Sequence, residues 1–198
     1  MDAFFEVLSD PEVAPPLKAA AIEQRLADWT RLLTRAVVRG CRDVGWNAAA
    51  KGHRLALLPK AGEEYLGLDV MAFGPHRPLP DGEDDQFPKE RWPLPEAVFE
   101  LENSQDDDRV AYSLWKVLCT RAPLRIVFGY RPDWETGRVL VHAIAEAVVR
   151  PIPIPVRCSL GGDTLMLLGS RGEGETFPYG YFKVWRLDPA AAVFRKIS

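Results

Sequence analysis

The chain has 198 residues, of which 47% are hydrophobic and 27% charged, the composition of a folded globular protein. No apolar run approaches the ~18 residues that cross a membrane, and the first residues lack the basic and apolar regions of a secretory signal. We therefore expect one domain over residues 1–198, located in the cytoplasm, with no membrane partner. The three cysteines and three histidines are too scattered for a zinc-ligand motif.

The net charge of −3 hides an uneven distribution along the chain. Residues 1–60 carry a net charge of +2, residues 61–108 carry −11, and residues 109–198 carry +6. An acidic centre between two basic flanks fits a protein that binds a polyanion with its flanks and a divalent cation at its centre.

The first predicted element is a helix over residues 17–40. Apolar side chains recur there at three- and four-residue steps, after prolines that cannot lie inside a helix. The outer face carries Arg31, Arg35 and Arg39 at four-residue steps, a row that can follow a nucleic-acid backbone or lie on a solvated helix. Glu23 falls in the first turns, where an acid favours the helix dipole.

Two predicted strands carry acids where a buried strand does not tolerate them unpaired. Residues 54–59 and 65–73 read as a hairpin whose second strand contains Asp69. Residues 97–102 form another strand, in which the period of two places Glu100 and Glu102 on one face. We expect both acidic strands to end at one site, with the geometry of a hard-metal site.

The proline- and acid-rich loop between these two strands, residues 74–96, predicts a lid. The other predicted elements follow in chain order. They are a helix over 109–121 capped by the preceding Asp run, a strand over 124–130, a helix over 136–150, an extended segment over 151–155, and strands over 164–169 and 179–187.

This order of elements, with Asp69 on one strand and Glu100-Leu101-Glu102 on the next, resembles the PD-(D/E)XK nuclease superfamily. The resemblance covers residues 17–130 and implies an α/β fold. That fold has a restriction-endonuclease-like αβββαβ core, in which helices flank a mixed central sheet. Residues 131–198 would be a C-terminal α/β extension.

The resemblance also implies the site and its chemistry, a Mg²⁺- or Mn²⁺-dependent cleavage of DNA that leaves a 5′-phosphate. Asp69, Glu100 and the Leu101 carbonyl would bind the metal. Glu102 stands where the family has a lysine, and it would bind a second ion or orient water. The catalytic lysine would then be Lys116, supplied by the following helix.

Three points remain open in the sequence. Lys116 lies with Tyr112 opposite the apolar side of its helix, so it is either a surface residue or a catalytic one with Tyr112 and Glu23 as accessory residues. The partner is expected to be DNA, with a homodimer as an open possibility. The alternatives to a nuclease are an inactive relative that binds nucleic acid or protein, and an unrelated interaction protein whose acids pair with arginines, for which the sequence offers Arg54, Arg121 and Arg125.

Overall fold

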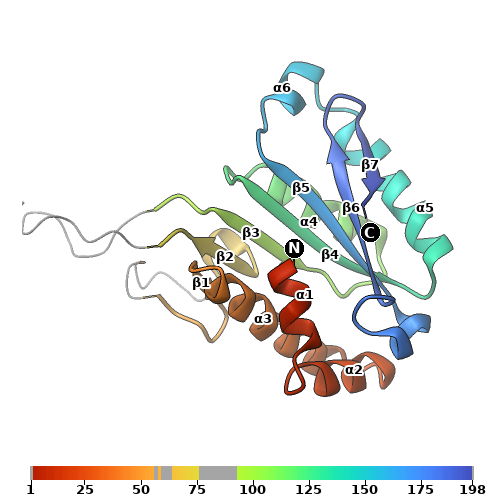
Figure 1. Cartoon of the computed structure of the whole chain (residues 1–198). Helices are drawn as coiled ribbons and strands as arrows, with labels where there is room; N and C mark the ends of the chain where they lie inside the picture. Colours follow the sequence, from red (N-terminus) through yellow and green to blue (C-terminus); the bar gives the residue numbers. More distant parts are fainter. Residues whose placement is uncertain (1, 56–57, 59–63, 76–92, 198) are drawn as a thin grey trace, which may run out of the picture.

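The computed structural model describes residues 2–55, 58, 64–75 and 93–197. Within these residues, seven strands form one mixed sheet with helices on both faces, so the protein has an α/β fold (Figure 1). The helices are α1 (Asp2–Ser9), α2 (Ala14–Ile22), α3 (Leu26–Asp43), α4 (Asp107–Leu118), α5 (Trp134–Ile144) and α6 (Ile154–Cys158). The strands are β1 (Asn47–Ala50), β2 (Val70–Phe73), β3 (Ala97–Leu101), β4 (Leu124–Arg131), β5 (Asp163–Ser170), β6 (Phe182–Asp188) and β7 (Val193–Lys196).

The strands lie in the sheet in the order in which they occur along the chain. Strands β1, β2 and β3 are antiparallel neighbours, β3, β4 and β5 are parallel, and β6 and β7 continue antiparallel from β5. Helix α4 connects β3 to β4, and α5 and α6 lie between β4 and β5, as parallel pairing requires a crossover. The segment after residue 130 therefore extends the same sheet.

Each face of the sheet has its own apolar core. On one face, α1, α2 and α3 pack their buried side chains against residues such as Phe99 and Phe128 (Figure 1). On the other face, α4 and α5 pack against residues such as Val98 and Val127. Because both faces of the central strands are covered, β3 and β4 read in the sequence as nearly continuous apolar runs.

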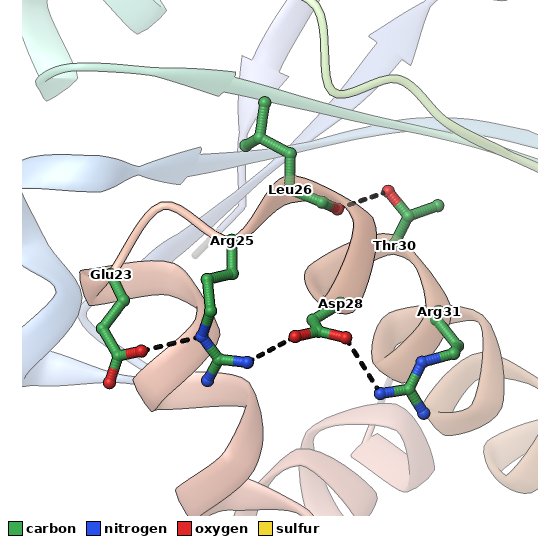
Figure 2. A network of polar contacts seen from close by, with 6 residues as sticks. All are labelled: Glu23, Arg25, Leu26, Asp28, Thr30 and Arg31. Carbon is green, nitrogen blue, oxygen red and sulfur yellow. Dashed lines mark hydrogen bonds and ion pairs between the residues drawn. The ribbon is translucent and has the colours of Figure 1, made fainter.

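The single helix predicted over 17–40 is wrong, because the chain breaks it between α2 and α3. Gln24 adopts a φ of 54°, which a right-handed helix cannot contain. Glu23 is consequently the C-cap that follows α2 rather than part of a first turn. Figure 2 shows the break, where Arg25 pairs with both Glu23 and Asp28.

The predicted hairpin is also wrong in its first strand. β2 pairs with β1 on one side and with β3 on the other, while the described residues of 54–59 lie outside the strands. β1 is rich in alanine, which has low strand propensity, so tertiary pairing with β2 and burial against α3 decide its conformation. The predicted strand over 65–73 is shortened, since Tyr65–Gly67 forms a 3₁₀ turn with positive φ at Leu66 and Gly67.

The acidic strands β2 and β3 are neighbours, as predicted, and α4 and β4 follow within three residues of their expected bounds. The extended segment expected over 151–155 is wrong at its end, because α6 begins at Ile154 and takes Pro155 into its first turn, where a proline is tolerated. Residues 76–92 of the predicted lid lie outside the described residues.

Replacing Gln24 by glycine should stabilise the protein. A side chain at positive φ is strained, and glycine relieves that strain at some cost in unfolded-state entropy, so we expect a gain of about 0.5–1 kcal/mol in the free energy of unfolding. Denaturant unfolding measures it. Gln24→Ala keeps the Cβ and is the control; equal stability of the two variants would contradict the strain at this break.

Candidate functional site

Asp69 and Glu100 meet because β2 and β3 run in opposite directions. Asp69 directly precedes β2, and the pairing of Val70 with Phe99 places the start of β2 beside the end of β3. The Leu101 backbone N–H donates a hydrogen bond of 2.6 Å to Asp69 Oδ2. This bond fixes the Asp69 carboxylate at the end of β3, next to Glu100.

Glu100 is a buried carboxylate that faces α4. Its side chain is on the opposite side of β3 from Phe99 and Leu101, both of which pack in the α1–α3 core as the period of two predicts. The residue is 4% exposed, and its Oε2 accepts a hydrogen bond of 3.1 Å from Ser113 Oγ. Oε1 is buried and has no hydrogen-bond partner among the described residues.

Lys116 comes from α4 to the same carboxylate. Its Nζ lies 2.8 Å from Glu100 Oε2 and donates a hydrogen bond of 2.6 Å to the Gly67 carbonyl. Lys116 lies off the apolar face of α4, where a lysine is usually exposed to solvent. Its side chain is nevertheless only 21% exposed. The long lysine stem lets the ammonium group reach the acidic site from the flank of the helix.

The environment of Glu100 shifts its protonation. Burial raises the pKa of the Glu100 carboxyl to about 7, with a further upward contribution from the Asp69 charge. The Lys116 ion pair and the Ser113 hydrogen bond oppose this rise in pKa and do not cancel it. The sequence pattern predicts that neighbouring acids lie at one site. In the structure, burial raises the pKa of Glu100 more than the neighbouring charge of Asp69 does.

Glu102 and Leu101 take different positions at the site. Glu102 is half-buried, and its Oε1 accepts a hydrogen bond of 2.7 Å from the Ser104 N–H, which bends the side chain toward the start of α4. The N–H and C=O of an extended residue point to the same side, so the Leu101 carbonyl faces Asp69 as its N–H does. In the part of the chain that the structure describes, no three His, Cys, Asp or Glu side chains cluster closely enough to form a metal-binding group.

These groups line one open cavity of about 570 Å³, the carboxylate cavity. It lies between the start of β2, the end of β3 and one side of α4. Its lining residues are Glu64, Gly67, Asp69, Glu100, Leu101, Glu102, Asp108, Arg109, Tyr112, Ser113 and Lys116.

A second cavity of about 590 Å³, the basic groove, adjoins the carboxylate cavity and shares Glu64 and Asp69 with it. Arg31 and Arg35 of α3 line it, with Lys51 and His53 from the turn after β1. Arg35 and Lys51 have no ion-pair partner among residues 2–55, 58, 64–75 and 93–197.

The arginine row of α3 is therefore divided. Arg31 donates a hydrogen bond of 3.1 Å to Asp28, as Figure 2 shows, and still lines the basic groove. Arg39 instead binds Asp10 of the segment after α1 at 2.6 Å. Burial, together with the charges of Arg42 and Arg35, lowers the pKa of His53.

If the protein were an unrelated interaction protein, its acids would pair with arginines, but Arg125 does not pair with Glu100. That guanidinium donates hydrogen bonds to the backbone carbonyls of Thr120, Leu160 and Gly161. Glu100 pairs with Lys116 in its place.

Sequence reasoning missed Ser113, Lys51 and His53. Ser113 lies three residues before Lys116, so the helical period already places both on one side of α4. Lys51 and His53 follow β1 directly, and a correct prediction of that alanine-rich strand would have located them.

Comparison of the chain with protein-family models, with curated proteins and with solved structures found no match. Of the helices in the described segments, none is both long and apolar enough to cross a lipid bilayer.

Glu100→Gln should stabilise the metal-free protein, and more so as the pH rises. In the folded protein Glu100 keeps its proton up to a pKa of about 7, whereas in the unfolded chain it loses the proton near the ordinary glutamate pKa of 4.5. The cost of the buried charge thus grows between these two pH values and levels off above them, where we expect a gain of about 3 kcal/mol. Thermal unfolding in EDTA from pH 5 to 8 measures it, and a difference that does not change with pH would contradict the burial effect.

Proposed function

We propose that this protein hydrolyses DNA phosphodiester bonds with the help of a bound divalent cation, in the manner of the PD-(D/E)XK nucleases, and does so in the cytoplasm. The observation that carries the proposal is the convergence of Asp69, Glu100 and Lys116 in one open cavity. Two carboxylates and one ammonium group, brought from the residue before β2, from β3 and from α4, suit this chemistry.

The chemistry of the donors fits Mg²⁺ or Mn²⁺. Glu100 Oε1 is a buried carboxylate oxygen without a partner among the described residues, and such an oxygen is expensive to bury unless it binds something. Asp69 and the Leu101 carbonyl complete an all-oxygen set, and Mg²⁺ needs only one or two carboxylates because it keeps several waters. When bound, the cation supplies positive charge for the phosphate and a more acidic water.

The side chains of the cavity have separate roles in this proposal. Asp69 and Glu100 would hold the cation at the end of β3. Lys116 keeps a positive charge beside Glu100, where it orients the attacking water or stabilises the charge that develops on the phosphate. Ser113 fixes one oxygen of Glu100 by a hydrogen bond, and the other oxygen, without a hydrogen-bond partner among the described residues, would bind the cation.

The connectivity of the sheet supports the nuclease reading. Helix α3, strands β1 to β3, helix α4 and strand β4 follow the order αβββαβ, with β1 to β3 antiparallel and β3 parallel to β4. The acids stand at the start of the second strand and on the third, and the lysine stands on the helix that follows.

The basic groove supports DNA as the substrate. Arg35 and Lys51 are exposed cations, unpaired within the described residues, and they lie on the side of the carboxylate cavity that Asp69 borders. A phosphate backbone bound by these cations would pass Asp69 and Glu100.

One observation favours the second candidate, an inactive relative that binds nucleic acid without cutting it. Lys116 already neutralises Glu100, and Glu102 is bonded to the Ser104 N–H, so two of the predicted catalytic groups are satisfied within the chain. The test must therefore separate binding from cleavage.

Asp69→Asn, Glu100→Gln and Lys116→Ala should each lower Mg²⁺- or Mn²⁺-dependent cleavage by at least about 100-fold, because the first two each remove a carboxylate that would hold the cation and the third removes the positive charge beside the phosphate. Cleavage of single-stranded, double-stranded and branched DNA is measured at low ionic strength, where backbone contacts persist. EDTA should abolish the activity.

The matched controls are Glu146→Gln and Lys183→Ala, which carry the same changes outside the cavity and should cut like the parent. Full activity of Lys116→Ala would make Lys116 structural. A parent protein that binds DNA and cuts none in any metal would overturn the hydrolysis and support the inactive relative.

A further inference from the structure

Helix α4 exposes two aromatic side chains beside the carboxylate cavity. Tyr112 is 59% exposed and Trp115 is 52% exposed. Their ring centroids are 5.9 Å apart at an interplanar angle of 31°, so the rings tilt only moderately from parallel. Lys116 Nζ lies 5.7 Å from the Tyr112 ring centroid, which holds that ring by a cation–π contact.

The two rings line a third depression of about 520 Å³, the aromatic shelf. Apolar side chains around the turn after α5 form its opposite wall. Its lining residues are Asp108, Ala111, Tyr112, Trp115, Ala147, Val148, Pro151 and Ile152.

The three depressions adjoin one another. The basic groove and the carboxylate cavity share Asp69, and the carboxylate cavity and the aromatic shelf share Tyr112. A chain bound along them would meet cations first, then the acidic site, and then two aromatic rings. The cations of the basic groove lie on one side of the carboxylate cavity and the aromatic rings on the other. A flexible polynucleotide strand, with its charged backbone and its bases, can contact both.

We propose that the aromatic shelf stacks an unpaired base next to the reacting phosphate, so that the substrate is a single-stranded segment; this inference rests on the proposed function. A base inside a duplex is already stacked on both faces and offers none to a side chain. An unpaired base can lie on Trp115 or Tyr112 while its phosphate reaches Asp69 and Glu100. The shelf then selects single strands, frayed ends or gaps over continuous duplex.

One of the described lining residues of the shelf is charged, Asp108, which the shelf shares with the carboxylate cavity. Arg150, at the end of the wall opposite the two rings, is paired with Glu146 at 2.7 Å. Stacking rather than ion pairing would therefore hold the base, and affinity at the shelf should depend weakly on salt, whereas affinity at the basic groove should depend strongly on it.

The test is fluorescence anisotropy with a labelled oligothymidylate of about 12 nucleotides and a duplex of equal length, in EDTA so that binding is read without cleavage. Trp115→Ala and Tyr112→Ala should each weaken single-strand binding by roughly tenfold and change duplex binding by less than about twofold. Tyr179→Ala, which removes an equally exposed aromatic ring outside the three depressions, is the control and should bind like the parent.

A second measurement locates the stacked base. Oligonucleotides with one abasic position are scanned along the strand, and one position should lose affinity for the parent protein but not for Trp115→Ala. Loss at that position in both proteins, or no such position, would overturn the stacking.

Other outcomes assign the shelf to a different partner. If Trp115→Ala weakens both DNA forms equally, or leaves both unchanged, the inference is overturned. If instead Trp115→Ala converts a dimer to a monomer in sedimentation, the shelf is an interface between copies of this chain and the inference is likewise overturned.

The failure of this inference can be told from the failure of the proposed function. If the parent protein cuts DNA and Trp115→Ala binds both DNA forms like the parent, the proposed hydrolysis stands and the proposed base stacking is overturned. If the parent protein cuts no DNA but Trp115→Ala selectively loses single-strand binding, the proposed base stacking stands and the proposed hydrolysis is overturned.

Discussion

The buried carboxylate of Glu100 constrains the structure around it. A carboxylate removed from water on an interior strand must be compensated by hydrogen bonds, by a cation or by protonation. Ser113 and Lys116 supply the first two from α4, and the raised pKa of Glu100 shows that the compensation is incomplete. The helix must therefore follow β3 closely and present a fixed side to it.

The side of α4 that faces β3 determines where the other side chains of the helix lie. With Ser113 and Lys116 turned to β3, residues such as Val110 and Leu114 enter the core beneath the sheet, and Tyr112 and Trp115 remain at the surface. One helix thus provides a core face, the cation of the carboxylate cavity and the exposed rings of the aromatic shelf. The acidic site and the shelf are consequences of the same packing.

The part of the fold that the sequence predicts best is the part where local and tertiary preferences agree. The apolar run of β3, the β-prone run of β4 and the Asp run that caps α4 were each predicted within three residues, since Asp106 accepts a hydrogen bond from the Asp108 N–H as a cap does. β1 was missed because alanines form a strand there only by pairing with β2. The break at Gln24 was missed because the apolar period continues through it.

The site shows the same division. Strand order and the period of two bring Asp69 next to Glu100 and place Glu100 toward α4, and both follow from the sequence pattern. The position of Lys116 does not, because a helical wheel gives the direction of the side chain and not the neighbour that its long stem reaches. Part of the acidity of residues 61–108 is structural, since Asp106 caps α4 and Asp107 pairs with Arg131.

The central claim is that Asp69 and Glu100 share one divalent cation. Crystals soaked in Mn²⁺ test it most directly, because the anomalous signal locates the ion without reference to activity. We predict one peak at coordination distance, about 2 Å, from a carboxylate oxygen of both Asp69 and Glu100, and its loss in Asp69→Asn. A parent crystal without a peak in the carboxylate cavity, with Glu100 still paired only to Lys116 and Ser113, would contradict it.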